Sequence, residues 1–168
     1  LLEEQAADPD AKIMILCSPH NPVGRVWTKE ELARVGEICK KNNVLVIADE
    51  IHSDLVYAGY VHTPFALASD APHLVCTSLG KTFNVAGLRL ANIFSSSAEL
   101  KKQYDQEIDA YSYSASNTFG LEMVQAAYSP EGEAWLEELL VYLQGNVEVV
   151  SEWCQKHNVG FTAPQGTF

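Results

Sequence analysis

A single lysine, Lys81, is the side chain in this sequence best suited to covalent chemistry. It follows a short apolar run, Leu74–Cys76, and a turn of small residues, and no other charged side chain occurs after that run until Arg89. In a partly dry pocket the pKa of a lysine falls, because burial disfavours the ammonium form, and the amine then becomes a nucleophile. In a solvent-facing loop the same lysine would do no chemistry, and this stretch by itself leaves both interpretations open.

The elements that must position this lysine are predicted from the pattern of apolar residues. Apolar runs without alternation favour strands that are covered on both faces, as in a parallel sheet. Thr28 is predicted to cap a helix that extends to Asn43, so strand, helix and strand follow one another as in a right-handed βαβ unit. The predicted strands are Lys12–Cys17, Val44–Ala48, Leu74–Cys76 and Leu90–Phe94. Later helices are predicted at Ala98–Tyr111, Thr118–Tyr128 and Glu131–His157, and Val159–Phe161 is predicted to begin another strand.

Polar side chains follow the first three predicted strands. In open parallel α/β sheets, ligands bind outside the carboxyl ends of the strands, so these side chains are expected to share one rim. The residues are Asn21, Asp49, His52, Ser78 and Lys81. Each has an ordinary alternative: Asn21 in a local turn, Asp49 or Ser78 as a helix cap, and His52 on the surface. Their occurrence at successive strand ends favours a shared ligand.

The chemistry of that ligand follows from the residue types. A hydroxyl, backbone N–H groups and a guanidinium suit a phosphate, and Ser78 and Arg89 would supply the side chains. An isolated lysine suits a Schiff base with an aldehyde, and Asp49 at a buried strand end suits a protonated ring nitrogen. Phosphate, aldehyde and pyridinium together describe pyridoxal 5'-phosphate (PLP).

Composition limits the class of protein. The chain has 168 residues, 47% of them apolar, which is enough for one globular domain with a core. A net charge of −11 argues against a nucleic-acid or anionic-membrane partner, since both need a basic face. No apolar run is long enough to span a membrane. The cysteines lack metal-like spacing and are expected to be free thiols in a reducing cytoplasm, with Cys17 and Cys76 buried.

Three blocks of sequence carry a resemblance to a known family. They are His20-Asn-Pro-Val-Gly24, Ala48-Asp-Glu-Ile-His52, and Ser78-Leu-Gly-Lys81 continued through Arg89. In this order and spacing they resemble the aminotransferase class I/II superfamily of fold-type I PLP enzymes. The wording from Ser18 to Trp27, together with Asp49 to Asp54, is most similar to the cystathionine β-lyase (C–S lyase) branch. The resemblance spans nearly the whole chain.

The resemblance implies a fold and roles for the residues. The fold would be the α/β large domain of PLP-dependent transferases, a three-layer αβα arrangement around a mostly parallel sheet. Lys81 would form the internal aldimine, and Asp49 would pair with the pyridine nitrogen. Asn21 would bind the ring hydroxyl oxygen, near His52, which stands where many members have tyrosine. The phosphate would be held by Ser78 and Arg89.

The resemblance also implies an activity and an organisation. A C–S β-lyase converts a small sulfur-containing amino acid into a thiol, pyruvate and ammonia, and an aminotransferase is the alternative. Residues 1–157 would be the second half of the large domain, and residues 158–168 would begin the small domain. Both ends look cut, so the chain is expected to be an internal piece that is inactive by itself. The full-length enzyme is expected to be a cytoplasmic homodimer.

Rival interpretations are less well supported by the residues. Ser78-x-x-Lys81 is the nucleophile spacing of serine β-lactamases, but Lys81-Thr82-Phe83 is not their Lys-Thr-Gly element and no Ser-Asp-Asn occurs. A nicotinamide-binding domain would need Gly-x-Gly-x-x-Gly after a strand, and none is present. A non-catalytic binding module remains open for the chain.

Overall fold

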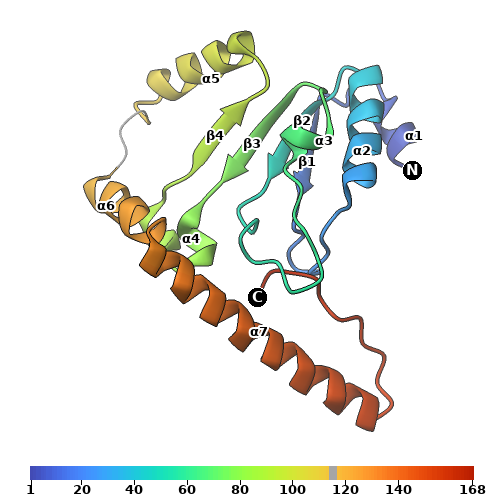
Figure 1. Cartoon of the computed structure of the whole chain (residues 1–168). Helices are drawn as coiled ribbons and strands as arrows, with labels where there is room; N and C mark the ends of the chain where they lie inside the picture. Colours follow the sequence, from blue (N-terminus) through green and yellow to red (C-terminus); the bar gives the residue numbers. More distant parts are fainter. Residues whose placement is uncertain (114–116) are drawn as a thin grey trace.

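The strands pair into a four-stranded sheet in the order β1-β2-β3-β4 in the computed structural model, which describes residues 1–113 and 117–168. The strands are β1 Ile13–Cys17, β2 Leu45–Asp49, β3 His73–Thr77 and β4 Asn92–Ser95. The β1–β2 and β2–β3 pairs are parallel, whereas β4 runs antiparallel to β3. Figure 1 shows the first three strands ending at the same lower edge of the sheet. The predicted α/β class with a mostly parallel sheet is confirmed.

Helices precede, connect and follow these strands. They are α1 Leu2–Ala6, α2 Lys29–Lys41, α3 Phe65–Ala68, α4 Leu79–Thr82, the 3-10 helix η1 Ala86–Leu88, α5 Ala98–Ala110, α6 Thr118–Ala127 and α7 Pro130–Lys156. The predicted long helices are confirmed to within about two residues, whereas α3 and η1 were not predicted and α4 was expected only through the helix-cap alternative for Ser78. Pro130 begins α7, at a position where its missing N–H group breaks no helical hydrogen bond.

The predicted start of α2 is confirmed in atomic detail. The Thr28 hydroxyl oxygen accepts a hydrogen bond from the Glu31 backbone N–H at 3.2 Å, and the Glu31 carboxylate accepts one from the Thr28 N–H at 3.0 Å. This capping box satisfies two N–H groups that a helix end leaves unpaired. Beyond it, the helical spacing of Leu32, Val35 and Ile38 turns one apolar face of α2 toward the sheet.

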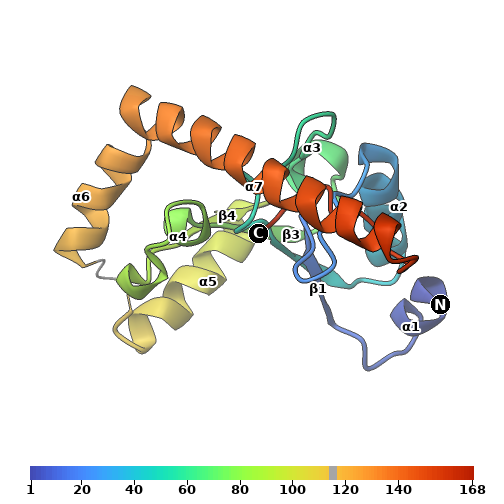
Figure 2. The ribbon, with the colours of Figure 1, turned by 90° about the horizontal axis from the view of Figure 1, so that it is seen from below.

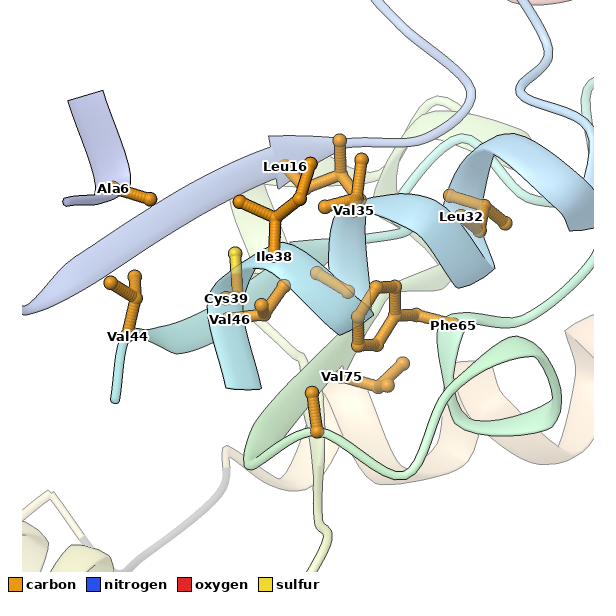
Figure 3. Packing of buried hydrophobic residues seen from close by; sticks show 12 residues of the cluster. Ala6, Leu16, Leu32, Val35, Ile38, Cys39, Val44, Val46, Phe65 and Val75 are labelled. Atoms are coloured by element: carbon orange, nitrogen blue, oxygen red, sulfur yellow. The ribbon is translucent and has the colours of Figure 1, made fainter. Parts of the chain in front are cut away.

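The core lies between one face of the sheet and the helices α2 and α3. Figure 3 shows Leu32 and Ile38 of α2 in one cluster with Leu16 of β1 and Val46 of β2, and Phe65 of α3 lies at the same end as Leu32. Leu32, Val46 and Phe65 are fully excluded from solvent. In the view from below, α2 and α3 lie on one side of the sheet and α5 lies on the other (Figure 2).

The opposite face of the sheet is open along β1. Ile13 and Ile15 are 57% and 71% exposed, whereas their neighbour Leu16 faces α2 and is 4% exposed. Successive side chains of a strand point to opposite faces, so the uninterrupted apolar run presents half of its side chains to each. The prediction of strands covered on both faces is therefore wrong for β1 within the described residues.

The segment after α7 returns to the lower edge of the sheet (Figure 1). Its residues 159–161 form no strand, contrary to prediction. Further along, the Gln165 N–H donates to the Gly24 carbonyl at 2.6 Å, and the Thr167 N–H donates to the Leu55 carbonyl at 2.7 Å. A Cβ atom on Gly166 would stand 2.6 Å from the Leu55 carbonyl oxygen, so only glycine fits this close approach. The segment is thus tied to the loops that follow β1 and β2.

Candidate active site at the carboxyl ends of β1, β2 and β3

The register of the sheet aligns the ends of three strands. Cys17 of β1 pairs with Asp49 of β2, and Asp49 pairs with Cys76 of β3. The backbone continues these pairings beyond the strands, because the Ser18 N–H donates to the Asp49 carbonyl at 3.0 Å and the Glu50 N–H donates to the Cys76 carbonyl at 2.8 Å. The segments that follow all three strands therefore leave the sheet side by side, as expected.

The loop after β1 brings Asn21 to His52. The loop is a tight turn, closed by a 2.7 Å hydrogen bond from the Gly24 N–H to the His20 carbonyl. The side-chain amide nitrogen of Asn21 lies 3.4 Å from Nε2 of His52. Asn21 thus lies in the turn, as its ordinary alternative has it, and its side chain also contacts the loop after β2. The residue remains exposed at the rim.

His52 is buried, contrary to the alternative of a surface histidine. It is 2% exposed, and burial lowers its pKa from the ordinary value, with the positive charge of Lys81 acting in the same direction and Asp49 opposing both. Both burial and Lys81 therefore favour the neutral form of the imidazole. Its Nδ1 atom is buried without a hydrogen-bond partner among the described residues, and the Phe168 ring lies 5.5 Å away between centroids.

Asp49 presents a half-buried carboxylate at the strand end. Its Oδ1 accepts a long hydrogen bond, 3.4 Å, from the Ile51 N–H, and a turn rather than a helix follows it. The helix-cap alternative is therefore wrong for Asp49. The pKa of the Cys76 thiol on the neighbouring strand is raised, mainly by burial and then by the negative charges of Asp49 and Glu50. Cys17 and Cys76 are half-buried rather than buried, and the four cysteines are free thiols.

Ser78, Lys81 and Arg89 line one cavity of about 220 Å³. Ser78 caps α4: its hydroxyl accepts from the Gly80 N–H at 3.0 Å and donates to the Leu90 carbonyl at 2.7 Å. The cap alternative for Ser78 therefore holds, and Ser78 also lines the cavity. Lys81 is half-buried, and Arg89 is exposed with a left-handed backbone, φ 50°.

A Cβ atom on Gly80 would stand 3.1 Å from the Ser78 hydroxyl and 3.3 Å from the Cα of Ala86. The absence of a side chain at Gly80 thus lets η1 pack close to α4. Gly80 and Ala86 both line the cavity that contains Lys81. A hollow of about 760 Å³ lies at the opposite end of β3, where it is lined by Glu37, Asp70 and His73 among others. It contains none of the predicted site residues, so the chemistry of the side chains and not the volume identifies the site.

Glu50 follows β2 directly after Asp49, and its place at a strand end predicts that it shares the rim, but the structure buries it instead. Glu50 is 2% exposed and points toward the core side, where it accepts from the Phe65 N–H at 2.7 Å and lies 3.0 Å from Nε2 of His62. Strand alternation offered the signal, because one of two adjacent acids must face away from the site. Glu50 fastens the turn after β2 to the start of α3.

No helix in the part of the chain that the structure describes is both long and apolar enough to cross a membrane.

Comparisons with known proteins agree with the geometry. Over 149 residues the chain is 39% identical to the cystathionine beta-lyase PatB of Bacillus subtilis (strain 168), covering 87% of this chain and 38% of that protein. The structure of a PLP-bound C-S lyase from Staphylococcus hominis matches with a TM-score of 0.90 at 34% identity, covering 99% of this chain and 42% of that one. An aspartate aminotransferase of Geobacillus stearothermophilus is 30% identical, over 98% of this chain and 42% of that protein.

The chain thus spans less than half the length of these relatives. The family model described as "Aminotransferase class I and II" matches residues 1–168. This chain belongs to the aminotransferase class I and II family.

Proposed function

We propose that the whole protein is a PLP-dependent carbon–sulfur β-lyase that acts on small sulfur-containing amino acids and releases a thiol, pyruvate and ammonia. The observation that carries the proposal is the convergence of Asp49, His52 and Lys81 at one rim, beside the cavity that Ser78 and Arg89 line. The similarity to PatB and to the lyase of Staphylococcus hominis supports the choice of reaction.

The residues at the rim fit PLP. The half-buried Asp49 carboxylate, with one long hydrogen bond of its own, would hold the proton on the ring nitrogen. Asn21 and His52 would bind the ring hydroxyl oxygen, which gives the buried imidazole, whose Nδ1 atom has no partner among the described residues, a reason to be there. The phosphate would be held by Ser78 and Arg89, and the amine of Lys81 would join the aldehyde.

The chain's own residues then account for the reaction. PLP supplies the electron sink that stabilises negative charge on the substrate's α carbon. With PLP bound, the Nζ atom of Lys81 would serve as the general base that takes the substrate's α proton. The Cβ–S bond then breaks with its electron pair leaving on sulfur, and water releases pyruvate and ammonia. The Asp49 carboxylate would keep the ring nitrogen protonated, which the electron sink requires.

An aminotransferase is the second candidate, and the match to an aspartate aminotransferase favours it. The same lysine and aspartate serve both reactions, which divide only after proton removal. The whole enzyme should be given cystathionine with no keto acid. The lyase is expected to release pyruvate over many turnovers. A single half-turnover that resumes when a keto acid is added would establish the aminotransferase instead.

The largest effect on activity is expected at Lys81. Replacing it by alanine in the whole enzyme should abolish turnover, because no other group at the rim can both bind the aldehyde covalently and take the α proton. Borohydride reduction followed by peptide mapping should label Lys81. Lys29→Ala, at the exposed start of α2, is the matched control and should leave labelling and turnover unchanged. A label on Lys12 or Lys29 would contradict the assignment.

We further propose that residues 1–157 are the second half of the PLP-binding large domain and that residues 158–168 begin the small domain. The whole enzyme would be a homodimer in the cytoplasm. Exposed aromatic side chains on α7, with Trp135 and Trp153 at 46% and 55% exposure, support burial against further protein. The free thiols support a reducing compartment. Analytical ultracentrifugation of the whole enzyme tests the dimer, and a monomer would contradict it.

A further inference from the structure

We propose that Asp54 and Thr82 form a positioning contact for Lys81. The Thr82 hydroxyl donates to Oδ2 of Asp54 at 2.9 Å, across 28 residues of sequence. Thr82 is 1% exposed, and Asp54 is half-buried. The inference rests on the proposed role of Lys81, and neither Asp54 nor Thr82 touches the cavity that Lys81 lines.

The contact joins the two segments that carry the proposed chemistry. Asp54 closes the turn after β2, which contains His52 and begins just beyond Asp49, the last residue of the strand. Thr82 directly follows Lys81 and is the last residue of α4. The hydrogen bond therefore fixes the position of the lysine segment relative to the aspartate and histidine segment.

The helix that carries Lys81 cannot orient itself. α4 has four residues, and a helix of one turn has little stability of its own, because nucleation is costly and few backbone bonds repay it. Its orientation must come from tertiary contacts. Thr82 supplies a directional one, since a hydrogen bond to a carboxylate is stronger and geometrically stricter than one between neutral groups.

A second contact holds the end of α4 from the other side. The Phe83 ring stacks on Trp135 of α7 with centroids 5.5 Å apart, and it meets Tyr128 edge-on at 6.5 Å. Asp54, Phe83 and Tyr128 surround a cavity of about 380 Å³, and burial, then the charge of Asp54, raises the pKa of the Tyr128 hydroxyl. The ring contacts are not directional in the way a hydrogen bond is, so the Asp54–Thr82 bond adds a directional restraint on the rotation of α4.

The direction of Lys81 follows from that restraint. Adjacent residues on a helix point about 100° apart, so fixing Thr82 toward Asp54 turns Lys81 toward the cavity with Ser78. Without the bond the lysine amine would sample a wider range of positions relative to Asp49. Because covalent attachment needs the amine at one place, loss of the bond should slow attachment and lower kcat more than it raises KM.

The test uses the whole protein freed of cofactor. After PLP is added, aliquots are reduced with borohydride, and the rise of PLP on Lys81 gives the attachment rate. Thr82→Val keeps the shape of the side chain and loses the hydroxyl, and it should slow attachment by at least about tenfold. Thr82→Ser restores the hydroxyl and should recover most of the rate. Thr118→Val, at the exposed first turn of α6, is the matched control and should behave as wild type.

Asp54→Ala removes the same bond from its less buried partner and should slow attachment by a similar factor. If the two residues act through one contact, the double variant with Thr82→Val should be no slower than either single variant. A wild-type rate in either folded single variant, or equal slowing by Thr82→Ser and Thr82→Val, overturns the inference. If the wild-type protein itself acquires no PLP on Lys81, the proposed function fails first, so the two failures are distinguishable.

Discussion

The region from β1 to β3 and the region from α5 to α7 are built in different ways. The first packs a dense core between the sheet and α2, with Leu32, Val46 and Phe65 fully enclosed. In the second, α5 has no buried residue, and α7 buries only Cys154 among its 27 residues. The proposed site residues come from the first region or from its edge at α4 and η1. The site therefore rests on the part of the chain that supplies its own core.

The sharpest way to test this contrast is to remove a side chain from each region. Leu32→Ala in α2 should lower the free energy of unfolding of the whole protein by about 2–5 kcal/mol, because it leaves a cavity in the core. Val141→Ala in α7, where the side chain is 74% exposed, should change it by less than about 0.5 kcal/mol. Urea titration of both variants measures the difference. Equal losses would mean that α7 is packed as tightly as α2 in the whole protein.

Replacing each of two helical glycines by alanine should change the free energy of unfolding in opposite directions. On Gly36 of α2 a Cβ atom would stand 1.9 Å from the Ser69 hydroxyl, so Gly36→Ala should destabilise by about 1–3 kcal/mol through overpacking against α3. On Gly145 of α7 a Cβ atom would meet nothing within 4 Å, so Gly145→Ala should stabilise by about 0.5–1 kcal/mol through helix propensity. Thermal unfolding followed by circular dichroism distinguishes them. Destabilisation by Gly145→Ala would refute the open surface on α7.

The smallest effect concerns pH. The pKa of His52 is lowered from 6.5 by burial and then by Lys81, so below that pH the unfolded chain binds a proton that the folded chain does not. Stability should therefore fall as pH drops below about 6.5, by less than about 1 kcal/mol between pH 7 and pH 6. His52→Gln should remove this part of the pH dependence. An unchanged profile in the variant would show that His52 is solvated in the whole protein.

Much of the first region could be predicted from sequence because its signals are local. The Thr28 cap, the helical spacing of α2 and the apolar runs of β1 to β3 depend on neighbours within a few residues. The open face of β1 could not be predicted, since Ile15 is as apolar as a buried residue, and its exposure depends on what lies over it. One-turn helices such as α3 and α4 leave no periodicity to detect.

The site divides in the same way. Polar residues after strands predicted that the loops carrying Asn21 and His52 would meet, because parallel strands end at one edge, and the two side chains lie 3.4 Å apart. The hydrogen bonds from Thr82 to Asp54 and from the Phe65 N–H to Glu50 could not be predicted. Each joins residues that are far apart in the sequence, and no helix or strand periodicity relates their positions. The hydroxyl of Ser78 is already engaged with Gly80 and Leu90, which composition alone could not reveal.

The return of the segment around Thr167 to the loop after β2 has a consequence for the order of assembly during synthesis. The Ser78–Leu90 contact closes over 12 residues, whereas the Tyr57 hydroxyl reaches the Thr167 carbonyl across 110. Short closures cost less chain entropy and form early, and synthesis delivers the chain from its N-terminal side. We expect the Ser78–Leu90 contact beside Lys81 to form soon after Leu90 leaves the ribosome. The flank of His52 stays exposed until Phe168 emerges.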